Sequence, residues 1–465
     1  MFVFRWEASL PPYLNDAPEI VRAYNPYIKL DPEAEEAFCL KTEQGAQEFV
    51  CEISAKNKAE RRALAIKYAE GLEYKKLTKR FVKTCLYDFC KALTGISLPY
   101  GSLTGVRPTK LYYELMKGCP DPKEALIDTF FVEPERARLI ADVVENQAGI
   151  YELNPKNAGV FVNIPFCPTR CKYCSFISTE IGRARKKIDD YIEAVRAELN
   201  EIIQKIDREG LKVRSIYVGG GTPTSLEARE LYDILYPVAN KNYGVEFTVE
   251  AGRPDSITGE KLAVLSDLGA TRISINPQTF NQKTLREIGR AHTPEQIIEA
   301  YSLSRQFNFD INMDLIAGLP GESFDDFSAS LEKTISLAPE NITVHTLAIK
   351  RGAVFRNDGL EKNVGGEVKK CVDFARERLK EAGYGPYYMY RQKNMADNLE
   401  NVGYCLPNKQ CVYNIDYMEE ICTIYSAGAA GMTKLVFHDQ NRIERVPNAK
   451  GLDDYLKQRG FLYNN

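Results

Sequence analysis

The chain has 465 residues, of which 44% are hydrophobic and 27% are charged, and its formal net charge is −3. This balance is typical of a globular protein and excludes a disordered or collagen-like chain. The chain contains no run of about 18 apolar residues, so we expect no transmembrane helix. We expect no signal peptide from its first residues, and the near-neutral charge offers no overall attraction for nucleic acid or acidic membranes.

Residues 1–153 are expected to form a separate N-terminal α+β domain, since a chain of this length holds two or three domains. Within it, residues 37–40 and 48–53 alternate around a turn and predict a β-hairpin. Apolar residues at helical spacing predict two helices, over residues 58–70 and 76–93.

From residue 160 onward, short strands alternate with helices. Six strands are predicted, over residues 160–164, 215–218, 246–250, 272–275, 310–315 and 341–347. Five helices are predicted between them, over residues 187–208, 226–239, 258–268, 293–307 and 324–337. This alternation indicates an α/β core with a parallel sheet or a partial or complete barrel, whose chemistry lies at the carboxyl ends of the strands.

The core domain is expected to span residues 154–390. From Gly383 the chain becomes irregular and tyrosine-rich, and residues 391–465 are predicted to form a small C-terminal extension. An amphipathic stretch over residues 451–458 ends it.

The chain has 12 cysteines, but a long chain without an export signal favours the reducing cytoplasm over a disulfide framework. Most of the thiols are therefore expected to be buried as small hydrophobic groups. This applies to nine of them: Cys39, Cys51, Cys85, Cys90, Cys119, Cys371, Cys405, Cys411 and Cys422. A second metal cluster on the last three is the less favoured alternative, since their spacing is wide and no histidine lies near.

The other three cysteines form the decisive motif. Cys167, Cys171 and Cys174 have Cys-x3-Cys-x2-Cys spacing and directly follow the first predicted core strand. Three thiolates can hold three irons of a [4Fe–4S] cluster, which leaves one iron open for a chelating small molecule. Zinc is a weaker candidate, because it needs four nitrogen or sulfur ligands and none of the chain's 3 histidines is nearby. A chance grouping of buried thiols fits poorly with a loop position.

This motif, with Tyr173 before the third cysteine, resembles that of the radical S-adenosylmethionine (SAM) enzymes. In that superfamily the open iron binds the amino and carboxylate groups of SAM, and an electron from the cluster releases a 5′-deoxyadenosyl radical. The resemblance implies a [4Fe–4S] cluster and one or two molecules of SAM as cofactors. It also implies that the core is a parallel (β/α) partial barrel.

Further segments narrow the resemblance to the oxygen-independent coproporphyrinogen III oxidase family, and the whole chain looks most like its coproporphyrinogen dehydrogenase branch from Gram-positive bacteria. They occur in order at residues 164–167 (Ile-Pro-Phe-Cys), 219–224 (Gly-Gly-Gly-Thr-Pro-Thr), 276–280 (Asn-Pro-Gln-Thr-Phe), 289–292 (Gly-Arg-Ala-His) and 314–321 (Asp-Leu-Ile-Ala-Gly-Leu-Pro-Gly). The implied reaction is oxidative decarboxylation of two propionates of the tetrapyrrole coproporphyrinogen III, giving protoporphyrinogen IX in haem biosynthesis. A flavodoxin or ferredoxin would supply the electron.

The resemblance also implies which residues bind SAM. Glycines after the second strand would let the backbone approach its methionine part, although a tight turn alone would explain them. The acids at the ends of the third and fifth strands would accept hydrogen bonds from its ammonium or ribose, unless they are merely solvated. The implied contacts are Phe161, Tyr173, Gly220, Gly221, Thr222, Glu250, Gln278, Arg290, Asp314 and Ala348. Gln278 and Arg290 match contacts to a second SAM, and an ordinary ion pair is the alternative for Arg290. No catalytic residue beyond the cluster, His292 included, is assigned.

Three departures leave the reaction open. The family usually has Tyr at Phe161 and His at Asn163, and some porphyrinogen-oxidising members have Cys at Phe176. Alternatives are a haem chaperone on the same scaffold, another radical enzyme such as a methyltransferase, and a binding module without a cluster. Five basic residues near the last core strand are candidates to pair with a tetracarboxylate, although loop cations are usually just solvated: Lys350, Arg351, Arg356, Arg391 and Lys393.

Overall fold

The computed structural model describes residues 1–67, 70–105, 107–348, 353, 366–392 and 395–457. The chain divides into two compact units. The first holds Met1–Ala141 with Arg391 and Gln392, and the second holds Asp142–Tyr390 and the residues from Met395 on. None of the described helices has the length and apolar character needed to span a bilayer.

The first unit is a five-stranded sheet packed against helices. Its strand order is β2 (Ile28–Leu30), β1 (Phe2–Ser9), β3 (Ala37–Gln44), β4 (Glu48–Ala55) and β5 (Lys58–Ala65). The predicted hairpin is confirmed, because β3 and β4 pair antiparallel. The predicted second helix is confirmed as α2 (Leu72–Thr94), and four more helices are α1 (Pro18–Ala23), α3 (Pro108–Leu115), α4 (Pro122–Phe130) and α5 (Pro134–Asn146), the last of which spans the division.

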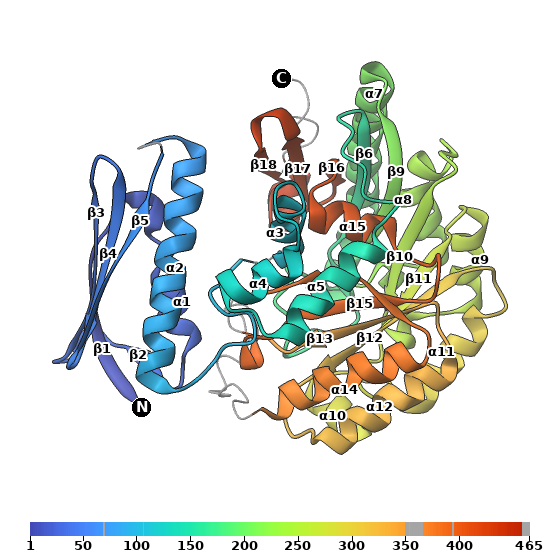
Figure 1. The fold of residues 1–465 in the computed structure, drawn as a ribbon. Coiled ribbons are helices and arrows are strands. Elements are labelled where there is room, and N and C mark those ends of the chain that lie inside the picture. The colour runs from blue at the N-terminus through green and yellow to red at the C-terminus, as the bar shows by residue number, and fades with distance from the viewer. Residues whose placement is uncertain (68–69, 106, 349–352, 354–365, 393–394, 458–465) are drawn as a thin grey trace. The chain divides into compact units, whose positions relative to one another are not determined.

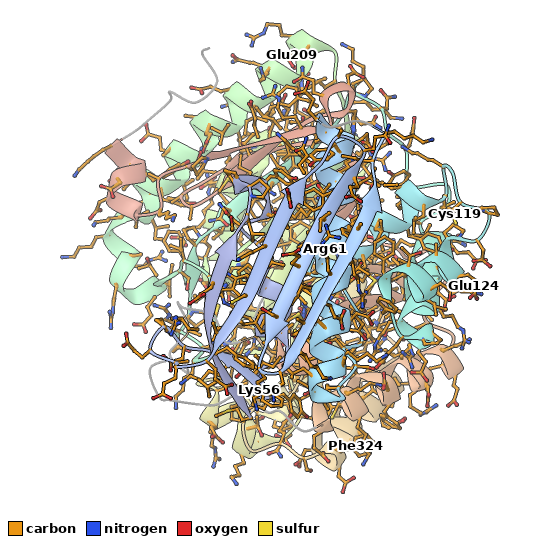
Figure 2. The ribbon with its side chains drawn as sticks, turned by 60° about the vertical axis from the view of Figure 1, so that its left-hand side comes forward. Lys56, Arg61, Cys119, Glu124, Glu209 and Phe324 are labelled. Atoms are coloured by element: carbon orange, nitrogen blue, oxygen red, sulfur yellow. The ribbon has the colours of Figure 1, made fainter. Side chains whose placement is uncertain are left out.

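One face of this sheet forms a core with α2, and the other carries charged side chains. Phe38, Phe49 and Ile53 from the strands are buried with Val82 and Phe89 from α2. The Arg61 side chain lies on the other face, away from α2 (Figure 2), where it pairs with Glu52 at 3.1 Å. The α+β prediction for this unit is confirmed.

The helix predicted over residues 58–70 is wrong. Residues Lys58–Ala65 form strand β5, which pairs antiparallel with β4 along its whole length. Its alanine, glutamate, arginine and leucine residues all have high helix propensity, which is why the sequence predicted a helix. Side chains in this segment alternate between exposed and half-buried, so pairing at the sheet edge outweighs intrinsic propensity.

The second unit is built on an 11-stranded sheet (Figure 1). All six predicted core strands are confirmed, as β6 (Asn157–Ile164), β9 (Lys212–Gly220), β10 (Glu246–Gly252), β11 (Arg272–Ile275), β12 (Asp310–Ala317) and β13 (Asn341–Thr346). They are parallel neighbours in chain order. The predicted helices are confirmed as α7 (Ile188–Glu209), α8 (Ala228–Ala239), α9 (Gly259–Asp267), α11 (Pro294–Ser304) and α12 (Phe324–Leu337). The core is therefore a parallel (β/α) partial barrel.

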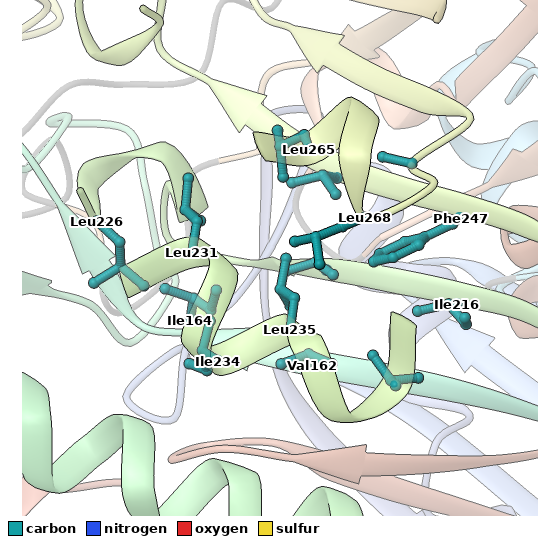
Figure 3. Close-up of a cluster of buried hydrophobic side chains, with 14 of the residues drawn as sticks. Val162, Ile164, Ile216, Leu226, Leu231, Ile234, Leu235, Phe247, Leu265 and Leu268 are labelled. Carbon is teal, nitrogen blue, oxygen red and sulfur yellow. The ribbon is translucent and has the colours of Figure 1, made fainter. Parts of the chain in front are cut away.

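The five predicted helices cover one face of this sheet and bury its apolar side chains. Val162 and Ile164 from β6 pack with Leu231 and Leu235 from α8 and Leu265 from α9 (Figure 3). All five are fully buried. Alternate residues of the same strands point to the opposite, concave face, because side chains in a strand alternate. The apolar face thus fixes which side chains reach the concave face.

The tyrosine-rich part predicted to be irregular is instead regular. It forms β14 (Gly385–Tyr390) and is followed by β15 (Asn401–Cys405), β16 (Thr423–Ala427), β17 (Met432–Phe437) and β18 (Arg442–Pro447). Strand β15 pairs antiparallel with β13, and β16 lies parallel beside β6. The prediction missed them because glycine, proline and adjacent tyrosines hide the alternation. The helices of this region are α14 (Glu367–Glu381), α15 (Val412–Glu419) and α16 (Leu452–Lys457), and α16 confirms the amphipathic stretch.

Candidate functional site

The three cysteines of the motif lie on the loop that leaves the carboxyl end of β6. The short strand β7 (Phe166–Cys167) pairs with β8 (Thr179–Glu180), which holds the two ends of the loop together. In its middle, the amide of Lys172 donates to the carbonyl of Ile288 at 3.0 Å, so the loop is anchored to the core. All three thiols are half-buried and free.

The surroundings of the thiols fit a polynuclear cluster. Within the described ranges, no three His, Cys, Asp or Glu side chains are close enough to ligate a single metal ion. A [4Fe–4S] cluster instead takes one thiolate per iron, which allows the sulfurs to stand apart. The Arg253 guanidinium lies 3.9 Å from Cys171 Sγ and donates to Thr169 at 3.0 Å. It would offset the negative charge of bound thiolates. Burial raises the pKa of the Cys174 thiol to about 11, so metal binding has to displace its proton.

The glycine turn after β9 is tightly packed against the same loop. A Cβ on Gly220, whose φ is +106°, would come within 2.3 Å of Asn163 Oδ1, and one on Gly221 within 2.4 Å of the Phe166 carbonyl. The amides of Gly221 and Thr222 already donate to the carbonyls of Ile164 and Phe166, at 2.8 and 2.6 Å. The turn therefore offers close backbone approach and carbonyl oxygens, which suit an ammonium donor.

Two carboxylates point into the concave face from neighbouring strands. Glu250 on β10 accepts from the Tyr217 hydroxyl at 2.6 Å, and burial raises the pKa of Glu250 to about 7. Burial also raises the pKa of Asp314 on β12, but hydrogen bonds from His345 and Asn312 outweigh it and hold that pKa below its usual value. Near neutral pH, Glu250 is therefore readily protonated, whereas Asp314 stays ionised.

Gln278 contacts the strand that carries Asp314, and Arg290 contacts the cysteine loop. Gln278 has a left-handed φ of +68°, and its backbone N–H donates to the backbone carbonyl of Asp314 at 2.9 Å. The Arg290 guanidinium donates to the carbonyl of Asn276 and, at 3.1 Å, to the hydroxyl of Tyr173. Tyr173 is thus tied to Arg290.

Several buried polar atoms of this region have no hydrogen-bond partner within the described part of the chain. They are Gln278 Oε1, Asn276 Oδ1 and Arg290 Nε. Leaving a buried polar atom unpaired costs about 1–3 kcal/mol, so such atoms together are typical of a site that a polar ligand completes. The residues present therefore fit SAM, with its amine, carboxylate and ribose groups.

The remaining candidates are placed as follows. Phe161 stacks on Tyr217 and Tyr413, with ring centroids 6.1 and 6.0 Å apart, and forms part of the apolar floor of the concave face. Ala348 is half-buried and forms an isolated bridge with Met395. His292 is fully buried, with Nδ1 3.7 Å from Asp255, which suits packing.

The nine remaining thiols are all free. Seven are buried, as expected, and the other two, Cys39 and Cys119, are half-buried. Of the basic candidates, Arg391 lies in the first unit, where it donates to the Leu103 carbonyl at 2.6 Å. Four lie outside the described residues: Lys350, Arg351, Arg356 and Lys393.

The sequence analysis missed two side chains of this region. Arg253 contacts the cysteine loop, as described above, and His345 lies with Nε2 3.5 Å from Asp314 Oδ2. Arg253 follows a predicted core strand and His345 lies near the carboxyl end of another, and this position is the signal that identifies them.

Comparison with known proteins agrees with this geometry. The model of the radical SAM superfamily matches residues 162–334. A protein of Bacillus subtilis, described as oxygen-independent coproporphyrinogen-III oxidase-like protein HemZ, is 40% identical over 395 residues, 82% of this chain and 78% of that protein. The chain belongs to the radical SAM superfamily and, within it, to the family of this oxygen-independent coproporphyrinogen-III oxidase-like protein. A [4Fe–4S] cluster and SAM are accordingly its cofactors.

A further relative and a solved structure are also similar to this chain. A heme chaperone HemW of Lactococcus lactis is 33% identical over 287 residues, 59% of this chain and 70% of the relative. The solved structure of coproporphyrinogen III oxidase HemN from Escherichia coli matches with a TM-score of 0.52 at 20% identity, covering 70% of this chain and 72% of that one. The structural match shows that this radical SAM protein shares the HemN fold.

Proposed function

We propose that this radical SAM protein is an oxidoreductase that converts coproporphyrinogen III to protoporphyrinogen IX without oxygen, in the cytoplasm. Each of two propionate side chains would lose a β-hydrogen atom, carbon dioxide and one electron to become a vinyl group. The observation that carries the proposal is the convergence of three cysteines and a set of unpaired buried polar atoms at one end of the barrel. The relative described as coproporphyrinogen-III oxidase-like supports the substrate.

Each of the site residues has a role in this proposal. Cys167, Cys171 and Cys174 would hold the cluster, which together with SAM supplies a 5′-deoxyadenosyl radical. Gly220, Gly221 and Thr222 would hold the methionine part of SAM, and Glu250 and Asp314 would accept from its ammonium and ribose.

The remaining residues would complete the SAM site. Arg290 would bind a carboxylate of SAM through its guanidinium, and Gln278 would use its unpaired oxygen to accept from the same or a second molecule. Tyr173 would keep Arg290 in place, while Phe161 and Ala348 would provide apolar contacts.

The proposal needs two external electron partners. A one-electron donor of the flavodoxin or ferredoxin type would reduce the cluster, and an acceptor would take the electron that each decarboxylation releases. The substrate would occupy the concave face, whose half-buried side chains include Tyr217 and His345.

A haem chaperone is the second candidate, because relatives described as heme chaperones are 33–34% identical to this chain over part of its length. On that candidate the protein would bind haem and would not decarboxylate coproporphyrinogen III.

One experiment separates the two candidates. The anaerobically reconstituted protein is reduced with dithionite, freed of the excess, and incubated with coproporphyrinogen III, SAM and a one-electron acceptor that takes the electron released by each decarboxylation. 5′-Deoxyadenosine and oxidised tetrapyrroles are then measured by liquid chromatography. We expect 5′-deoxyadenosine together with monovinyl and divinyl products. Formation of 5′-deoxyadenosine without vinyl products would reject the decarboxylase proposal, and stoichiometric haem binding in the same preparation would then favour the chaperone.

A further inference from the structure

The loop that carries the cysteines also exposes two adjacent apolar side chains. Phe176 is 66% exposed and Ile177 is 48% exposed, and they follow Cys174 directly after a single serine. Isolated exposed hydrophobic residues are ordinary on protein surfaces. Two neighbours on a loop beside the cluster ligands are less so, because exposing them has a solvation cost that binding would recover.

The chain around this apolar pair is basic. Residues 170–187 contain six lysines and arginines but only one acid, Glu180, in a chain whose net charge is −3. Two carboxylates from elsewhere, Glu230 and Asp453, pair with Arg185 and Lys187. Even with these two counted, six positive charges stand against three negative ones in this segment, and the exposed Asp189 and Asp190 follow it at the start of α7. Lys172 and Lys186 make no ion pair with the described residues.

The apolar pair and the exposed basic residues Arg183 and Lys186 lie within eleven residues of one another, on the segment that closes the cysteine loop. Strand β8 pairs with β7, so that Glu180 lies opposite Cys167. The short helix α6 (Ile181–Ala184) follows at once and carries Arg183. Arg183 and Lys186 are both exposed. We call Lys172, Phe176, Ile177, Arg183 and Lys186 the cluster-side surface.

We propose that the cluster-side surface docks a small acidic electron-carrier protein that reduces the cluster. This inference rests on the proposed function, because only a protein that cleaves SAM reductively needs such a donor. The argument is one of position and charge. An electron must enter from outside, the donor has to approach closely, and this surface is formed by the cluster loop itself. Its positive excess complements an acidic donor, which speeds encounter. Its small apolar centre suits a weak, transient complex.

The test compares two ways of reducing the same protein. Full-length reconstituted protein is assayed for 5′-deoxyadenosine formation with dithionite, which needs no docking, and with increasing concentrations of a reduced acidic flavodoxin. The variants are Arg183→Glu/Lys186→Glu and Phe176→Ser. Two matched controls in the first unit are Lys75→Glu/Lys117→Glu, both exposed lysines, and Leu77→Ser, an exposed leucine. Binding of oxidised flavodoxin is measured separately by calorimetry at low and high salt.

We expect the charge-reversal variant to need about tenfold more flavodoxin for half-maximal activity and Phe176→Ser about threefold more, with dithionite-driven rates unchanged. Flavodoxin binding to the wild type should weaken with salt, and the controls should match the wild type. Equal flavodoxin dependence in the wild type and both surface variants would overturn the docking proposal. An equal loss with dithionite would overturn it too, because the surface would then serve the cluster and not a partner. Failure of the wild type with dithionite would instead reject the proposed function.

Discussion

The two faces of the parallel sheet in the second unit differ sharply, although their side chains alternate along the same strands. On β10, Phe247 and Val249 belong to the apolar cluster under the helices, whereas Glu246 and Glu250 face the other way. Strand β12 shows the same division: Met313 belongs to the apolar cluster under the helices, whereas the acidic residues of this strand face the other way. The period of two in a strand lets one face provide stability while the other provides charged and polar groups for chemistry.

The largest effect is expected at the mouth of the concave face. Cys171→Ala removes one of three thiols that would hold the cluster, so iron content should fall from about four per chain to about none. SAM cleavage should fall below detection in the same preparation. Iron analysis and liquid chromatography measure the two quantities, and Cys119→Ala, a half-buried thiol in the first unit, is the matched control. Retention of SAM cleavage in Cys171→Ala would contradict the ligand assignment.

A substitution on the helix-covered face should lower the stability of the protein without lowering its iron content. Leu235→Ala leaves a cavity between α8 and the sheet (Figure 3), and the free energy of unfolding should fall by about 2–5 kcal/mol. Urea unfolding followed by circular dichroism measures this loss. Iron uptake at low temperature should be unchanged, and Leu235→Met, which nearly keeps the volume, should cost less than about 1.5 kcal/mol. Loss of iron uptake without loss of stability would break the division between the faces.

The buried acid Glu250 should make stability depend on pH. Because burial raises the folded-state pKa of Glu250 to about 7 from 4.5, the folded protein holds a proton that the unfolded chain releases between these values. Its contribution to stability is therefore present at low pH and lost as pH rises toward about 7, by about 3 kcal/mol at most.

Glu250→Gln cannot titrate at this position and isolates the effect. The stability of the wild type, measured without cofactors, should fall relative to this variant between about pH 5 and pH 8. Glu246→Gln is unsuitable as a control, because Glu246 accepts from backbone amides of α15. Asp128→Asn, in the first unit, is a better one. A pH-independent difference between wild type and Glu250→Gln would show that Glu250 ionises normally.

The sequence predicted the core of the second unit well because its strands and helices differ in length and period. The short stretch of consecutive apolar residues in β6 is typical of a buried strand, and the amphipathic pattern of α7 is typical of a helix. The cysteine motif could be found for a similar reason, since ligand spacing within one loop is local. The contacts of Arg253 and His345 could not, because they depend on how neighbouring strands align in space.

Segments at the edges of sheets were harder to predict. At β14 the alternation of Tyr388 and Tyr390 is obscured by Tyr387 and Met389, and the partner strand comes later in the chain. At β5 the residues are good helix formers, and only pairing with β4 makes them a strand. Edge strands carry weak patterns because only one side of their backbone is paired.

Strand β5 also provides the smallest expected effect and extends the comparison of sheet faces to the first unit. Arg61 pairs with Glu52 at 3.1 Å, but the two side chains are 61% and 51% exposed, so water competes with the pair. Arg61→Ala should therefore change the free energy of unfolding by less than about 1 kcal/mol. The single tryptophan, Trp6, stacks on Phe38 in this unit, so its fluorescence during urea unfolding reports the effect. Phe38→Leu on the buried face is the contrasting variant and should cost more, because Phe38 is fully buried. An Arg61→Ala loss as large as that of Phe38→Leu would mean that the charged face of the sheet is packed and not solvated.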